Sequence, residues 1–143
     1  MKDGSLCRFS ISMPAALVAQ LDAMVRAKGF ANRSQAVAEM VRGHLVEHRC
    51  RNRNHDIAGT ITLVYDHHRR NIQSLLTDIQ HDHQDLIISA LHVHLDHHNC
   101  MEVLAVRGTV GAVRQLSDRL LAAKGVKHGK LTVTATGKEF GHG

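Results

Sequence analysis

The sequence has 143 residues, which suits one ordinary domain or two small ones, and only 3% of them are aromatic, so aliphatic side chains must supply the core. No stretch approaches 18 consecutive apolar residues, and the first residues lack the apolar run of a signal peptide. Three widely spaced cysteines form no disulfide framework. We therefore expect a cytoplasmic protein without a membrane segment.

The positive charge is concentrated near the N-terminus. Residues 1–55 contain nine Lys and Arg against four acids, whereas residues 56–143 contain nine of each sign. The whole net charge of +5 therefore lies in the first part of the chain. This asymmetry is typical of a polyanion-binding head on a neutral body, although a solvated basic surface would have the same composition.

The first part of the sequence predicts a strand followed by two helices. Residues 7–13 alternate polar and apolar side chains, as a period-2 strand does. Pro14 suits the first position of a helix, and Gly29 suits its end. Ser34 is the expected N-cap of the second helix. The polar segment 49–55 reads as a linker, which leaves residues 1–48 as the first domain.

The remainder, residues 56–143, reads as β-α-β-β-α-β, the order of a ferredoxin-like domain. The strand over residues 86–95 is apolar on both faces, so we expect it to be buried. The predicted fold class is therefore α+β. The expected elements are strands at 57–65, 86–95, 100–106 and 130–136, with amphipathic helices around 72–79 and 110–121.

A short N-terminal strand needs a partner, because so few residues are not stable as an isolated strand. Paired with a second copy, it forms a two-stranded ribbon that fits the DNA major groove and presents Arg8, Ser10 and Ser12. Arg33 and the first turn after Ser34 would hold a phosphate. An ordinary edge strand with a helical hairpin is the alternative. The segment resembles the ribbon-helix-helix DNA-binding family through Arg8-Phe9-Ser10-Ile11-Ser12, Leu17, Leu21, Gly29-Phe30 and Asn32-Arg33-Ser34.

The second group of functional residues consists of histidines and a cysteine. The chain has 13 histidines, densest between residues 81 and 98. His92 and His94 project from the same face of a strand, and the turn at 96–99 returns Cys100 beside them. His81 and His83 follow the preceding helix and could supply a fourth nitrogen. Two imidazoles and a thiolate can therefore converge on a metal ion.

The donor types leave the metal open. Three nitrogens and one sulfur suit tetrahedral zinc, whereas a planar site points to nickel(II) or copper(II). A small-molecule sensor would not need the cluster, and a metalloenzyme would need an open metal position that four protein ligands do not leave. We therefore expect a regulator that is not an enzyme, with another metal or a small molecule as the alternative signal.

Over residues 7–140 the chain resembles the nickel-responsive regulators of the ribbon-helix-helix class, the NikR family. The segments that carry the resemblance are Gly59-Thr60-Ile61-Thr62, Gln80-His81, Leu91-His92-Val93-His94, His98-Asn99-Cys100 and Gly125-Val126-Lys127-His128-Gly129. The resemblance implies one square-planar nickel(II) per subunit, held by His92, His94 and Cys100 together with His81 of a neighbouring subunit. It also implies ACT-type domains that form a tetramer, a dimer of dimers, which represses nickel-uptake genes by binding operator DNA when nickel is bound.

One position departs from the pattern of the family. Members often have an acidic residue where this chain has Gln35, although Glu39 follows one turn later. The difference puts in doubt a cation site that the family can form near the DNA-bound interface. Five further histidines could form weaker metal sites and are left unassigned: His67, His68, His83, His97 and His98.

Overall fold

The computed structural model describes residues 4–141 of the chain, which form two compact units. One unit contains the described residues up to 48 together with those from 137 onward, and the other is Arg49–Thr136. The sequence predicts that residues 1–48 and 56–143 fold as separate domains joined by a linker at 49–55, and these boundaries stay a prediction. Within residues 4–141, none of the helices combines the length and the apolarity that are needed to cross a membrane.

The N-terminal strand predicted over residues 7–13 is not formed in the single chain, where residues 4–14 are neither helix nor strand. The physical reason is that a lone strand has no neighbour to complete its backbone hydrogen bonds. Its apolar side chains are accordingly uncovered: Phe9 is 74% exposed and Ile11 57% exposed. Leu17 in the following helix is 50% exposed, so the apolar stripe of this unit continues from the extended segment onto the helix.

Two helices follow, α1 (Ala15–Lys28) and α2 (Arg33–Arg49). Pro14 directly precedes α1, one residue earlier than predicted. Gly29 ends α1 in the left-handed conformation, as predicted, with φ 72°. The predicted N-cap of α2 was wrong, because Ser34 lies inside the helix. Asn32 caps it instead, its side chain accepting from the Gln35 N–H at 2.9 Å.

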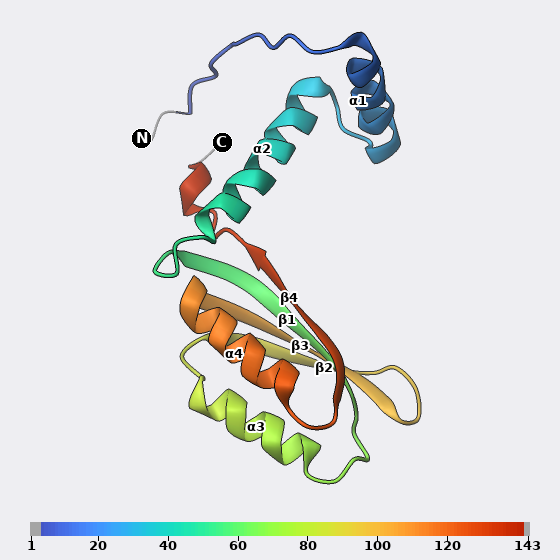
Figure 1. The fold of residues 1–143 in the computed structure, drawn as a ribbon, viewed down its shortest axis with the longest axis vertical. Helices are drawn as coiled ribbons and strands as arrows, with labels where there is room; N and C mark the ends of the chain where they lie inside the picture. The colour runs from blue at the N-terminus through green and yellow to red at the C-terminus, as the bar shows by residue number, and fades with distance from the viewer. Residues whose placement is uncertain (1–3, 142–143) are drawn as a thin grey trace. The chain divides into compact units, whose positions relative to one another are not determined.

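The second unit is a four-stranded antiparallel sheet in the order β2-β3-β1-β4, and its own two helices, α3 and α4, lie on one face of this sheet (Figure 1). This arrangement confirms the predicted β-α-β-β-α-β order. A short 3-10 helix, Lys138–Phe140, follows the last strand. The elements are β1 (Asp56–Asp66), α3 (Ile72–Asp82), β2 (Ile87–His94), β3 (Asn99–Thr109), α4 (Val110–Ala122) and β4 (Val126–Thr134).

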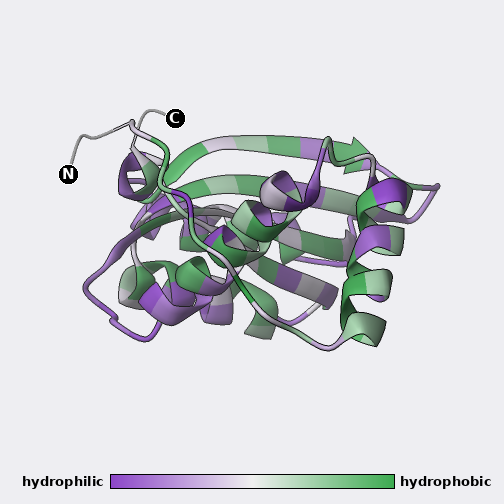
Figure 2. Cartoon of the chain, turned by 90° about the horizontal axis from the view of Figure 1, so that it is seen from above, coloured by the Kyte–Doolittle hydropathy of each residue, from purple (hydrophilic) through white to green (hydrophobic). Residues whose placement is uncertain are grey.

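The core lies between the sheet and the two helices, where hydrophobic residues alternate along the central strands (Figure 2). It includes Ile57, Ile61, Leu63, Tyr65, Ile72, Leu76, Leu104, Val106, Val110, Val113, Leu116 and Leu120. The prediction that the strand over 86–95 is buried was wrong. This segment is the edge strand β2, where Ile88 and Leu91 are 66% and 60% exposed. A strand that is apolar on both faces but uncovered in one chain is typical of a subunit interface.

Candidate metal centre

The hairpin of β2 and β3 sets the positions of three of the predicted metal ligands. His94 lies directly opposite Cys100, and His92 lies opposite Glu102. Residues opposite one another in an antiparallel pair share a face of the sheet, so both imidazoles lie on the face that carries the buried Cys100. The ring centres of His92 and His94 are 5.3 Å apart.

A further histidine, which the sequence left unassigned, completes the tightest group of potential ligands. One ligand atom from each of His67, His94 and Cys100 lies within 4.8 Å of the others. His67 follows the end of β1, where Tyr65 pairs with Cys100, so the register of β1 and β3 delivers it to this place. Its Nδ1 is buried and has no hydrogen-bond partner among the described residues. In the sequence, only the position of His67 marked it, two residues beyond Tyr65, the last residue of the predicted strand 57–65.

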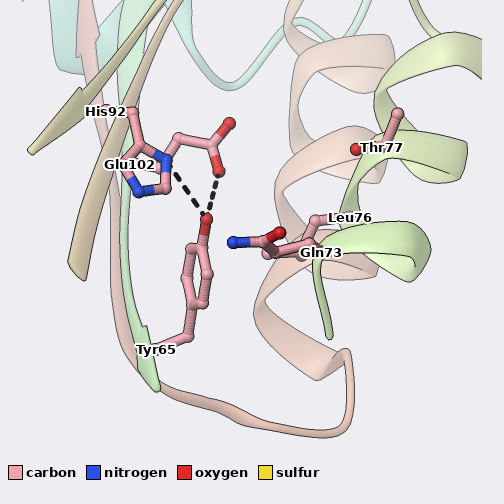
Figure 3. A pocket seen from close by; sticks show the side chains of 6 residues that line it. All are labelled: Tyr65, Gln73, Leu76, Thr77, His92 and Glu102. Atoms are coloured by element: carbon pink, nitrogen blue, oxygen red, sulfur yellow. Dashed lines mark hydrogen bonds between the residues drawn. The ribbon is translucent and has the colours of Figure 1, made fainter. Parts of the chain in front are cut away.

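His92 belongs instead to a hydrogen-bonded network on the same face of the sheet (Figure 3). The Tyr65 hydroxyl donates to Glu102 at 3.0 Å and lies 3.5 Å from Nδ1 of His92. Gln80, from the last turn of α3, donates to the other carboxylate oxygen of Glu102 at 2.9 Å. The network therefore joins α3, through β3, to the strand that carries His92.

An open cavity of about 230 Å³ lies beside this network, between α3 and the sheet. The Tyr65 hydroxyl points toward His92 and Glu102 at its wall, while the α3 side chains line the other side (Figure 3). The lining residues are Tyr65, Gln73, Leu76, Thr77, His92 and Glu102.

His81 lies in the last turn of α3, directly after Gln80. It is exposed, while Gln80 turns inward to Glu102. Within the described part of the chain, the group of converging ligand atoms contains neither His81 nor His92. An exposed imidazole at a helix end is available to a neighbouring molecule.

The surroundings of Cys100 and His67 favour the uncharged form of both side chains before a metal binds. Burial raises the pKa of the Cys100 thiol, although the His67 backbone N–H and the Tyr65 hydroxyl oppose this effect. Burial also lowers the pKa of His67, and the neighbouring His68 and His94 lower it further. A neutral imidazole with an unpartnered buried nitrogen is ready to coordinate, whereas the thiol must first lose its proton. Imidazole and thiolate donors suit nickel(II), so the residues present fit this metal.

The residues predicted to contact DNA lie in the other unit. Arg8, Ser10 and Ser12 are exposed on the extended segment before α1. Arg33, the first residue of α2, forms a two-pronged ion pair with Asp22 of α1, with N–O distances of 2.7 and 2.8 Å. Ser34 is exposed in the first turn of α2.

Comparison with known proteins gives matches along nearly the whole chain. Residues 58–134 match the family model of the NikR C-terminal nickel-binding domain, and residues 8–47 match that of the ribbon-helix-helix proteins of the copG family. A nickel-responsive regulator of Geotalea uraniireducens is 49% identical over 137 residues, covering 96% of this chain and 99% of the relative. One from Pyrococcus horikoshii is 46% identical over 135 residues, covering 94% and 98%.

A solved structure shows the fold of about half the chain. An uncharacterized protein of Thermotoga maritima matches with a TM-score of 0.50 and 15% identity, covering 55% of this chain and 98% of that protein. At this identity the likeness concerns the fold alone.

Proposed function

The chain belongs to the NikR family of nickel-responsive transcriptional regulators, which are not enzymes, and we propose that it represses nickel-uptake genes by binding operator DNA when nickel is bound. The observation that carries this proposal is the gathering of imidazoles around the buried Cys100 thiol. The proposal also gives the protein a cytoplasmic location, where its DNA lies.

For the metal we propose one nickel(II) per subunit, held by His92, His94 and Cys100 of one subunit and His81 of a neighbouring subunit. The support is that both strand histidines share a face with Cys100, while His81 is exposed at the end of α3. Bound nickel would supply a bridge between subunits. The role of Gln80 and Glu102 would then be to hold the last turn of α3, and with it His81, against the sheet.

His67 offers a different set of ligands within one chain, together with His94 and Cys100. The two sets predict different results, because His92 takes part in one and His67 in the other. His92→Ala should abolish nickel-dependent DNA binding under the proposal, whereas His67→Ala should leave a response to nickel. The reverse result would assign the site to His67.

For DNA we propose that the extended segments of two subunits pair as a ribbon and present Arg8, Ser10 and Ser12 to base edges. The exposed apolar residues of this unit support the pairing, since a second copy would cover them. Arg33 and Ser34, in the first turn of α2, would contact phosphate. The edge strand β2 supports further assembly through the second unit into a dimer of dimers.

The test is a titration of the metal-free protein with nickel while the fluorescence anisotropy of a labelled fragment of its upstream DNA is followed. Tight binding that begins at about one nickel per subunit supports the proposal. Parallel titrations with zinc, with copper and with purified small metabolites test whether another metal or a small molecule is the signal. Equal DNA binding with and without metal would contradict nickel control and leave the cluster with another role.

A further inference from the structure

The segment that joins α2 to β1 forms two hydrogen-bonded turns and does not run as an extended tether. The Asn52 N–H donates to the carbonyl oxygen of Arg49 at 3.0 Å, which closes the first turn. The His55 N–H donates to the carbonyl oxygen of Asn52 at 3.1 Å, which closes the second. The Asn54 N–H also donates to Oδ1 of Asn52 at 3.0 Å, and such a bond to an Asn side chain is typical of a well-defined turn. The segment that the sequence predicted as a linker is therefore ordered by its own backbone.

The end of this segment, residues 53–55, docks on the first turn of α4 (Figure 1). The Val110 N–H donates to the carbonyl oxygen of His55 at 2.9 Å. The Gly111 N–H donates to the carbonyl oxygen of Arg53, also at 2.9 Å. The N–H groups in the first turn of a helix have no acceptor within that helix, so residues 53–55 supply acceptors that α4 cannot supply itself. We call residues 53–55 the docked segment.

The lack of a side chain at position 111 lets the docked segment come this close to α4. The three atoms nearest to a Cβ added at Gly111 all belong to Arg53. Two of them are guanidinium nitrogens at 3.3 Å, and the third is the carbonyl oxygen at 3.4 Å. A long side chain at position 111 would therefore have to occupy the space that Arg53 fills, and it would displace the docked segment.

The surface on which the segment docks belongs to the core of the second unit. Val110, Val113 and Leu116 are fully buried and hold α4 against the sheet. Asp56 directly follows the docked segment, and it pairs with Thr109 in the ladder between β1 and β3. The docked segment is thus held between a core helix and a central strand, so its backbone follows the second unit.

We infer that the docked segment is a strap that shortens the connection between α2 and the second unit from six residues, 50–55, to three, 50–52. Its consequence for DNA binding rests on the proposed function, in which the DNA-binding units of two subunits pair. Pairing within one assembly becomes less favourable as the connecting chain lengthens, roughly as the −3/2 power of its length. Release of the strap doubles this length and should therefore weaken DNA binding by about threefold.

The test compares three full-length proteins: the wild type, Gly111→Leu, and the matched control Ala112→Leu, which enlarges the next residue of α4. Amide hydrogen exchange of the Val110 N–H, followed by NMR, reports docking directly, because the acceptor of this N–H lies in the docked segment. The N–H of residue 112 is an internal reference, since it donates to Oγ1 of Thr109 within the same turn. The affinity of each nickel-loaded protein for its upstream DNA is measured by fluorescence anisotropy, and circular dichroism checks that all three are equally folded.

We expect the Val110 amide to exchange at least about tenfold more slowly than in an unfolded chain in the wild type and the control, but not in Gly111→Leu. The DNA dissociation constant of Gly111→Leu should be about threefold higher than that of the other two proteins, with equal bound nickel in all three.

Fast exchange of the Val110 amide in the wild type would overturn the inference, whether or not Gly111→Leu folds. Released docking with unchanged DNA affinity would overturn the effect on pairing. Loss of DNA binding in all three proteins, with the Val110 amide still protected in the wild type, would contradict the proposed function and still support the docking.

Discussion

The hydrogen bond from the Tyr65 hydroxyl to the Glu102 carboxylate should contribute strongly to the stability of the second unit. The substitution Tyr65→Phe removes this hydrogen bond with little change in the shape of the side chain. Tyr65 is 2% exposed and Glu102 9% exposed, so most of the surface of both side chains is shielded from solvent. The carboxylate would keep only its bond from Gln80. Hydrogen bonds to buried charged groups contribute about 1.5–3 kcal/mol, and we expect the free energy of unfolding to fall by that amount.

The assay is urea denaturation of the metal-free protein at fixed concentration, followed by circular dichroism, because the chain has one Tyr and no Trp. The control repeats Tyr65→Phe in a Glu102→Gln background. There the lost bond is to a neutral acceptor, so the cost should fall to about 1 kcal/mol. An unfolding free energy within about 0.5 kcal/mol of the wild type would refute the reasoning, as would equal costs in both backgrounds.

Four further predictions concern the backbone and the first unit. Gly59→Ala should destabilise by about 1–3 kcal/mol, because the added Cβ would lie 2.5 Å from a backbone carbonyl oxygen of β4. Gly43→Ala, with open space around this position in α2, should stabilise by about 0.5–1 kcal/mol. A rise of the urea midpoint for Gly59→Ala would contradict the first prediction, and a fall for Gly43→Ala would contradict the second. Asn32→Ala should cost about 1 kcal/mol through the lost helix cap, measured by the same titration, and no change would remove its capping role. The hydrogen bond from Arg33 holds the pKa of Asp22 below its ordinary value of 3.8. The contribution of this ion pair to stability is therefore present above pH 3.8 and is lost as the pH falls through the lowered pKa. NMR of the carboxyl group should show the low pKa of Asp22, and Arg33→Gln should raise it.

Local patterns in the sequence were sufficient for most of the secondary structure. The helical spacing of the apolar residues predicted α3 and α4, and Gly29 marked the end of α1. The errors came where local chemistry offers two solutions. Asn32 and Ser34 are both good capping residues, and only the path of the chain into α2 selects Asn32. An apolar strand is buried by a helix or by another subunit, and its sequence is the same in both cases.

The metal centre divides in the same way between sequence and tertiary structure. The sequence by itself determined that His92 and His94 share one face of a strand and that Cys100 returns beside them, because side-chain alternation and a short turn are local properties. Only the tertiary structure decided that His67 lies against His94 and Cys100. The pairing of β1 with β3 joins residues more than 30 positions apart, and its register is set by packing of the whole sheet against α3 and α4 rather than by any local pattern.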